Sequence, residues 1–184
     1  MLKRITWKDK GVISLHIRDG LFTLAQMRVR PYVQFFDIIS KDGKWNNIDL
    51  NAVKELFCVS VATKTCIKPM AVQMLERENI KPNDRPMPRK MINPNLSCCR
   101  DDGYPFEGGD LIEIDERGET VGMPILKSDL DIEKDKELIY CYELTNMWTT
   151  PGELRERLLQ YFDHGINWDA HKEKVFPGIT PPTK

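Results

Sequence analysis

The sequence predicts an α+β domain, built mainly from antiparallel β-sheet and completed by an amphipathic helix near the C-terminus. Residues 12–17 alternate between apolar and polar side chains, which is the period of a strand with one buried face. Only residues 150–165 combine a helix start signal, an apolar stripe and a stop signal. A doubly wound parallel sheet would need several long helices between its strands, so the sequence favours the antiparallel class.

The first forty residues are expected to form a three-stranded antiparallel meander. An Asp-Gly pair at 19–20 separates the strand at 12–17 from a second apolar run at 21–29. Asp-Gly is typical of a two-residue hairpin turn, because glycine readily takes the positive φ that the turn requires. Pro31 ends the second run, and the aromatic content of residues 32–39 predicts a third strand that is buried on both faces.

The middle of the chain gives weaker signals. Residues 56–62 form an apolar run that predicts a fourth strand. Residues 70–79 leave two alternatives open, a short helix or an irregular connection. Residues 81–105 contain five prolines, which lack the N–H group that a helix or a sheet needs. This segment is therefore predicted to be a long ordered loop or a clamp over the sheet.

The C-terminal half is predicted to begin with a second hairpin. Residues 110–115 and 119–123 flank a turn that contains Gly118. Residues 138–144 are another apolar run and are predicted to form a further strand.

The helix that follows is the best defined element. Thr150 is placed at the N-cap, Pro151 at the first helical position and Glu153 three residues after the cap, which is the pattern of a capping box. Gly165 is expected to end the helix. The apolar side chains recur with helical spacing and share one face, and they are Leu154, Leu158, Tyr161 and Phe162.

Length and composition favour one domain in a reducing compartment. Of the 184 residues 41% are hydrophobic, so residues 1–176 are expected to form a single β-rich domain, followed by a flexible, proline-rich tail at 177–184. The five cysteines are odd in number and form no Cys-x-x-Cys pair, so they are expected to be reduced and mostly buried. The sequence shows no long apolar run and no signal peptide, which predicts a cytoplasmic protein.

The sequence offers no recognisable catalytic arrangement. It contains no nucleophile elbow, phosphate loop, His-Glu-x-x-His motif or dinucleotide fingerprint. The histidines at 16, 164 and 171 are far apart in the chain, and structural roles are favoured for the first two. Residues 129–137 alternate acids but lack the mid-loop glycine of a calcium site, so a solvated charged loop is predicted. No catalytic residue, metal site or cofactor is therefore assigned.

Charge is unevenly distributed along a chain whose net charge is only −1. Residues 1–80 contain 13 basic and 8 acidic residues, whereas residues 101–143 contain 14 acidic and 4 basic residues. Near-neutrality argues against a nucleic-acid binder, which normally shows a basic excess. The acidic segment is either a solubilising face or a docking surface for a basic protein.

Several short motifs together resemble the Immunity protein 26 family of bacterial polymorphic-toxin and contact-dependent inhibition systems. The run Asp19-Gly20-Leu21-Phe22 is similar to the family's opening hairpin, and Phe35-Phe36-Asp37 is similar to its aromatic strand. Residues 56–61 resemble its next strand, and Trp148-Thr149-Thr150-Pro151 leads into a helix like its closing one. These pieces are spread over residues 7–165.

The resemblance implies a cytoplasmic protein that binds a toxin domain delivered by neighbouring cells and neutralises it by stoichiometric occlusion, without being an enzyme. Many antibacterial toxins are nucleases with basic clefts, so an acidic surface is the expected contact, without direct binding of nucleic acid or of a membrane. Residues 76–110 depart from the family's pattern. The alternative is a small-ligand-binding module or an enzyme with a pocket under residues 81–105. The candidate contacts with the toxin are Asp110, Glu113, Asp115, Glu116, Glu119, Asp129, Asp131 and Glu133.

Overall fold

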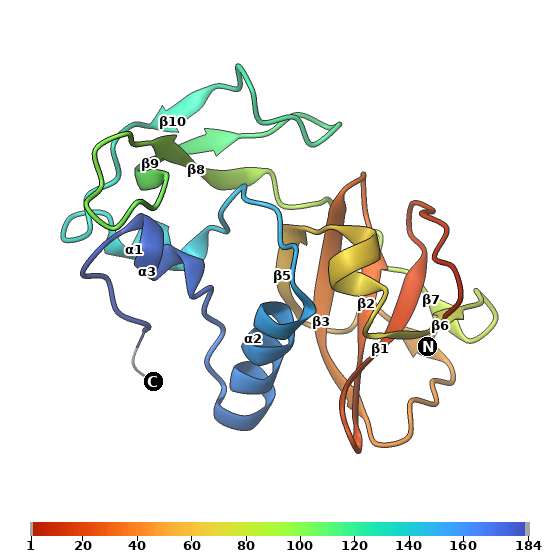
Figure 1. Ribbon diagram of the computed structural model, residues 1–184. Coiled ribbons are helices and arrows are strands. Elements are labelled where there is room, and N and C mark those ends of the chain that lie inside the picture. The colour runs from red at the N-terminus through yellow and green to blue at the C-terminus, as the bar shows by residue number, and fades with distance from the viewer. Residues whose placement is uncertain (1, 183–184) are drawn as a thin grey trace. The chain divides into compact units, whose positions relative to one another are not determined.

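The computed structural model describes residues 2–182 and has the predicted α+β class (Figure 1). The chain divides into two compact units. The first contains the residues up to 87 together with 147–158, and the second contains residues 88–146 and those from 159 onward. None of the described helices is long and apolar enough to cross a membrane.

The first unit is built on a five-stranded antiparallel sheet, which confirms the predicted meander. Arg18 pairs with Leu21, and Gly20 between them has a φ of 69°, so the Asp-Gly pair forms the expected two-residue turn. The predicted fourth strand is also present. The strand order is β5-β3-β2-β1-β6, with β1 at Val12–Arg18, β2 at Leu21–Met27, β3 at Tyr32–Ser40, β5 at Glu55–Ser60 and β6 at Ala71–Leu75.

Residues 70–79 are neither a helix nor an irregular connection, so both alternatives were wrong. Strand β6 occupies Ala71–Leu75 and pairs with β1, with Val12 opposite Leu75. A five-residue apolar run has too little periodicity to identify a strand, and its partner lies about sixty residues earlier in the chain. This unit also contains three short elements: β4 (Ile48–Asp49), β7 (Ile80–Lys81), which pairs with β4 in parallel, and the π-helix η1 (Thr63–Ile67).

Burial along β3 changes halfway. Tyr32–Phe36 is buried on both faces as predicted, but Asp37 is exposed and Ile39 is largely exposed, so the prediction fails for the second half. Phe35 stacks on Phe57 of β5 at 4.6 Å. One part of the core around this sheet contains Val12, Leu24, Phe36, Trp45, Leu50 and Ile80.

The second unit contains a three-stranded antiparallel sheet in the order β10-β9-β8 and short helices (Figure 1). Its bounds are β8 at Lys90–Leu96, β9 at Phe106–Glu113, β10 at Ile125–Lys127, α1 at Lys136–Cys141 and α3 at His171–Val175. Its core contains Ile92, Leu111, Leu130, Ile139, Leu144, Trp168, Val175, Phe176 and Ile179.

The proline-rich segment at 81–105 is only partly a loop. Strand β8 includes Pro94, which lies opposite Gly109 of β9. A proline is tolerated there because β8 is the outer strand of the sheet, where a missing N–H removes no bond to a second full strand. Gly109 is required at this pairing, because a Cβ on it would lie 2.8 Å from the carbonyl oxygen of Asn93.

Two of the strand predictions for the C-terminal half are wrong. The partner of β9 is β10, not residues 119–123, and residues 114–124 form the loop between them, with Gly118 at a φ of 77°. Residues 138–144 contain most of helix α1 instead of a strand. The carbonyl of Asp131 accepts the N–H of Asp135, and this turn leads into the helix, which buries Ile139.

Helix α2 spans Pro151–His164, as the start and stop signals predicted. Thr150 Oγ1 donates a hydrogen bond to the Glu153 carboxylate. Gly165 follows with a φ of 73°, and its N–H donates to the Tyr161 carbonyl at 2.7 Å. On the apolar face Leu154 and Leu158 are fully buried, whereas Tyr161 and Phe162 are half-buried.

Part of the expected tail is packed against the second unit. Ile179 is buried in its core, and Tyr140 Oη donates a hydrogen bond to the Thr180 carbonyl at 3.0 Å. Residues 183 and 184 lie outside the described residues.

All five cysteines are free, as expected, but most of them are not buried. Cys58 and Cys66 are buried, whereas Cys98, Cys99 and Cys141 are exposed.

Candidate functional site

The predicted contact residues lie on a surface that we call the acidic hairpin, residues 110–133. It comprises the end of β9, the 114–124 loop, β10 and the loop that follows β10. The two loops lie at opposite ends of β10 (Figure 1). The structure therefore places Asp110 and Glu113 on β9 and divides the other predicted contacts between the tip loop, before β10, and the base loop, after it.

Three of the predicted acids hold the backbone of these loops in place. Asp115 Oδ1 accepts the N–H groups of Arg117 and Glu119 at 2.9 and 2.8 Å. Asp110 Oδ1 accepts the N–H of Asp129 at 2.8 Å, which joins β9 to the base loop. Asp131 Oδ1 accepts the N–H groups of Glu133 and Lys134, both at 2.9 Å. These hydrogen bonds lower the pKa of the Asp131 carboxyl, because they stabilise its charged form.

Two further acids have weaker contacts. Glu113 lies 3.7 Å from Arg89 in a half-exposed ion pair. Asp129 is exposed and has a positive φ of 48°, and the amide of Asn95 lies 3.5 Å from its carboxylate. The neighbouring Asp135 forms an ion pair with Lys127 that was not predicted from the sequence, and this contact lowers the pKa of the Asp135 carboxyl.

The remaining predicted acids are exposed and unpaired. In the part of the chain that the structure describes, the carboxylates of Glu116, Glu119 and Glu133 make no hydrogen bond or ion pair. Among the eight predicted contacts, these three carboxylates are therefore the most available to a partner.

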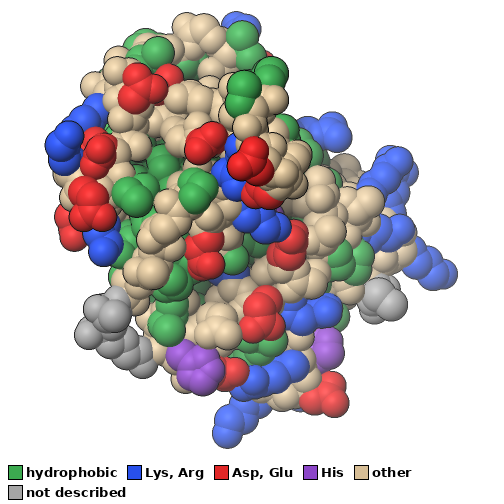
Figure 2. Space-filling view, turned by 60° about the vertical axis from the view of Figure 1, so that its left-hand side comes forward, with side chains coloured by type: hydrophobic (Ala, Val, Ile, Leu, Met, Phe, Trp, Pro, Cys, Tyr) green, Lys and Arg blue, Asp and Glu red, His purple; other side chains and the backbone are tan. Residues whose placement is uncertain are grey.

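Apolar side chains are exposed between these acids. Val121 of the tip loop is 86% exposed, and Ile125 and Leu126 of β10 are 59% and 44% exposed. Within the described sheet, β10 pairs only with β9, so its other edge presents unpaired backbone groups. In the space-filling view, acidic groups are separated by basic and apolar ones, so the negative charge forms no continuous patch on the face shown (Figure 2).

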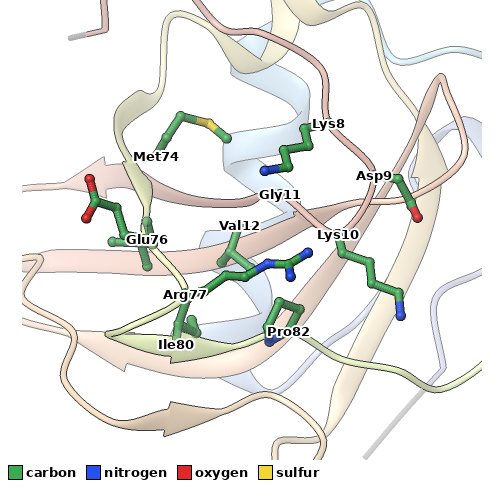
Figure 3. Close-up of a pocket in the computed structure, with 11 residues that line it drawn as sticks. Lys8, Asp9, Lys10, Gly11, Val12, Met74, Glu76, Arg77, Ile80 and Pro82 are labelled. Carbon is green, nitrogen blue, oxygen red and sulfur yellow. The ribbon is translucent and has the colours of Figure 1, made fainter.

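A second candidate site lies in the first unit and was not predicted from the sequence. It is a cavity of about 330 Å³, which we call the basic hollow (Figure 3). Only Pro82 among its lining residues belongs to the 81–105 segment, under which a pocket was the alternative expectation. The lining is formed by Lys8, Asp9, Lys10, Gly11, Val12, Met74, Leu75, Glu76, Arg77, Ile80 and Pro82.

A tight turn forms one wall of the basic hollow. The N–H of Gly11 donates to the carbonyl of Lys8 at 2.8 Å, and Lys10 has a positive φ of 60°. Two backbone hydrogen bonds join the turn to Met27 at the end of β2. The Lys10 N–H donates to the Met27 carbonyl at 2.9 Å, and the Met27 N–H donates to the Gly11 carbonyl at 2.8 Å. A Cβ at position 11 would lie 2.8 Å from the Lys8 carbonyl oxygen, so the turn requires glycine there.

The cations around the basic hollow differ in their partners. Lys10 forms an ion pair with Asp84 at 2.5 Å, and this contact lowers the pKa of the Asp84 carboxyl. Lys8 Nζ and the Arg77 guanidinium have no hydrogen-bond or ion-pair partner among residues 2–182. Figure 3 shows both side chains extending toward the middle of the hollow, whereas the Glu76 carboxylate points away. The sequence signal that could have found this site was the basic excess of residues 1–80.

The histidines do not assemble a catalytic group. His16 Nε2 lies 3.6 Å from Asp19, and its ring packs against Phe22. His171 Nδ1 lies 3.0 Å from Asp169, which also accepts the His171 N–H in a local turn. Over residues 2–182, no cluster of three histidine, cysteine or acidic side chains could hold a metal ion.

Comparison with known proteins gives a family and no function. No curated protein and no solved structure matches the chain. Nothing in these comparisons links it to the Immunity protein 26 family, so that resemblance stays a prediction. The model of one family, a domain of unknown function designated DUF8309, matches residues 2–181. Because this match covers nearly the whole chain, the protein belongs to the DUF8309 family.

Proposed function

We propose that this protein binds a basic partner protein through the acidic hairpin. One observation carries the proposal: the unpaired carboxylates of Glu116 and Glu119 lie in the loop that precedes β10, and β10 exposes Ile125 and Leu126. Protein interfaces commonly have an apolar centre and a polar or charged rim. Carboxylates at such a rim attract a basic surface and speed association.

The edge of β10 supports the same proposal. Unpaired N–H and C=O groups at an edge strand can pair with a strand of another protein. Such pairing would bring the partner's backbone alongside Ile125 and Leu126, between the two acidic loops. Affinity would then come from the apolar and backbone contacts, and selectivity for a basic partner from the carboxylates.

The partner that we propose is a bacterial toxin domain, which the protein neutralises by occluding its active cleft in the cytoplasm. The resemblance to the Immunity protein 26 family motivates this choice. Charge complementarity supports it, because a nuclease toxin needs a basic cleft to hold phosphates, and an acidic protein surface can occupy that cleft. Within this proposal the protein acts by binding and is not an enzyme.

The test measures binding to the toxin domain encoded by the gene next to that of this protein. We compare Glu116→Lys/Glu119→Lys with the matched control Glu78→Lys/Asp101→Lys, which changes the charge equally at exposed acids outside the acidic hairpin. The hairpin variant should associate about tenfold more slowly, and its rate should depend less on salt, whereas the control should behave like the parent protein. Both variants should unfold at the parent's temperature.

Two results would overturn the proposal in different ways. If the parent protein neither binds the neighbouring toxin domain nor protects cells that express it, the toxin partner is wrong. If it binds, but the hairpin variant and the control associate equally fast, the acidic hairpin is a solubilising face and docking occurs elsewhere.

A further inference from the structure

We propose that the basic hollow binds a small organic anion, with the anionic head between Lys8 and Arg77 and an apolar body against Met74 and Leu75. This site lies in the first unit and is independent of the acidic hairpin. The shared chemistry of the ligand is one carboxylate or phosphate group attached to an apolar group.

The size and lining of the basic hollow fit such a ligand. Its volume of about 330 Å³ lies at the lower end of the range of small-molecule sites. Met74 and Leu75 are half-buried and give the hollow an apolar wall, and the buried side chains of Val12 and Ile80 support it from the core. Sites of this kind bury an apolar body against such a wall and fix the polar end with a few charged groups.

The arrangement of charges selects an anion. Lys10 is neutralised by Asp84, but the side chains of Lys8 and Arg77 extend toward the same space without an acidic partner among the described residues. Two like charges that lie close together repel each other. An anion between them adds an attraction to each, and these two attractions offset the repulsion. The guanidinium of Arg77 can also donate two parallel N–H bonds to a carboxylate or a phosphate.

The backbone on both sides of the basic hollow is held in place before a ligand arrives. On one side, the turn at 8–11 is hydrogen-bonded to Met27, and these bonds keep Lys10 at a positive φ that is unfavourable for a non-glycine residue. On the other side, the backbone of Asn83, next to Pro82, is hydrogen-bonded to the buried side chain of Gln26. A rigid frame reduces the ordering cost of binding, so a small ligand can bind with few contacts.

Arg77 also lines a second, more open hollow of about 210 Å³. Its other lining residues are mostly polar and include Asn47, Asp49, Asn79 and Lys81. A polar substituent on the ligand can therefore extend past Arg77 into this second hollow, while the apolar body stays against Met74.

The test uses three small probes that share a phenyl group. These are 3-phenylpropionate as the carboxylate, phenyl phosphate as the phosphate, and 3-phenylpropionamide as the neutral control. Binding is measured by calorimetry, and by the NMR shifts of the backbone amides of residues 8–12 and 74–80. We expect at least one anion to bind with a Kd of about 1 mM or tighter and to shift these amides, and the amide probe to bind at least about tenfold more weakly.

Variants locate the anionic head. Lys8→Gln and Arg77→Gln should each weaken binding of the anion by about tenfold or more, because each removes a charge-assisted contact. Lys41→Gln, at an exposed lysine of the turn after β3, should bind like the parent. The relative affinity of 3-phenylpropionate and phenyl phosphate shows whether the site prefers a carboxylate or a phosphate as the anionic head.

Three results would each overturn the inference. The first is that neither anion binds at about 10 mM. The second is that the neutral amide binds as tightly as the anions, which would make the basic hollow an apolar site without charge selection. The third is that Lys8→Gln and Arg77→Gln bind like Lys41→Gln. Because none of these measurements uses a toxin, their failure is distinguishable from the failure of the proposed function.

Discussion

The side chain of Gln26 pairs with the backbone of Asn83 through two hydrogen bonds. Gln26 Nε2 donates to the Asn83 carbonyl at 2.9 Å, and the Asn83 N–H donates to Gln26 Oε1 at 2.7 Å. Both residues are fully buried. The side-chain amide thus takes the place of a strand partner, and it ties the segment after β7 to the middle of the main sheet. Arg28 reinforces this contact with a hydrogen bond to the Arg85 carbonyl at 2.6 Å.

Gln26→Met should lower the free energy of unfolding by about 1–3 kcal/mol, because it leaves the buried Asn83 N–H and carbonyl with fewer partners. Methionine has a similar volume, so loss of packing contributes little. The matched control is Gln73→Met on β6, where the side chain is exposed. Urea denaturation measures both changes, and an equal effect of the two substitutions would show that the paired hydrogen bonds add nothing.

Elements with a local signal could be predicted from the sequence. The hairpin turn at 19–20 depends on the conformational freedom of Gly20, and helix α2 depends on Thr150, Pro151 and Gly165 at its two ends. In each case the residues that determine the structure lie within the element, so no knowledge of distant contacts was needed.

Elements whose structure depends on distant residues could not be predicted. Strand β6 forms because the edge of β1 is available to it, and residues 138–144 contain a helix because the turn at Asp131–Asp135 starts one. A short apolar run can be buried equally well in a helix or in a strand, so its own sequence does not decide between them.

The candidate site was predictable only in part for a related reason. The sequence gives the number of carboxylates at 110–133 but not the atoms that they contact. Asp110, Asp115 and Asp131 turned out to accept backbone N–H groups, which is a structural role. The basic hollow was missed because Lys8 and Arg77 are 69 positions apart in the sequence.

Leu158→Ala should lower the free energy of unfolding by about 2–5 kcal/mol, because the leucine on the apolar face of α2 is fully buried and its removal leaves a cavity. The matched control, Leu96→Ala, truncates a leucine of β8 that is 74% exposed and should change stability by no more than about 0.5 kcal/mol. Chemical denaturation of both variants gives the comparison. Equal losses would mean that the apolar face of α2 does not contribute to a packed core.

Alkylation should divide the five cysteines into two groups. Cys98, Cys99 and Cys141 are exposed and should react with iodoacetamide in the native protein. Cys58 and Cys66 are buried, and burial raises the pKa of the Cys66 thiol to about 12, so little reactive thiolate forms there. Peptide mapping by mass spectrometry should find these two modified only after denaturation. Modification of native Cys66 as fast as Cys98 would contradict the burial.

Acid should weaken the contact between β4 and β7. Asp49 Oδ2 accepts a hydrogen bond from Lys81 Nζ at 2.9 Å, and Asp49 Oδ1 accepts two from Asn51. These contacts, the one from Lys81 first, lower the pKa of Asp49 from 3.8 to about 2. In the unfolded chain the carboxyl has its ordinary pKa and takes up a proton at a higher pH than in the folded protein. The unfolded state therefore binds more protons between about pH 4 and pH 2, and stability falls as the pH is lowered through this range.

Asp49→Asn should make the free energy of unfolding less sensitive to acid between about pH 4 and pH 2, because the variant has no carboxyl at this position to protonate. Above about pH 4 the parent keeps the full contribution of the charged Asp49, so there the variant should be the less stable protein. Urea denaturation at a series of pH values measures both effects, with Asp101→Asn at an exposed turn as the matched control. If Asp49→Asn and Asp101→Asn lose stability with the same slope as the parent, the ion pair between Asp49 and Lys81 does not contribute to folding. A smaller slope for Asp49→Asn alone would assign this part of the acid sensitivity to the Asp49 carboxyl and its contacts with Lys81 and Asn51.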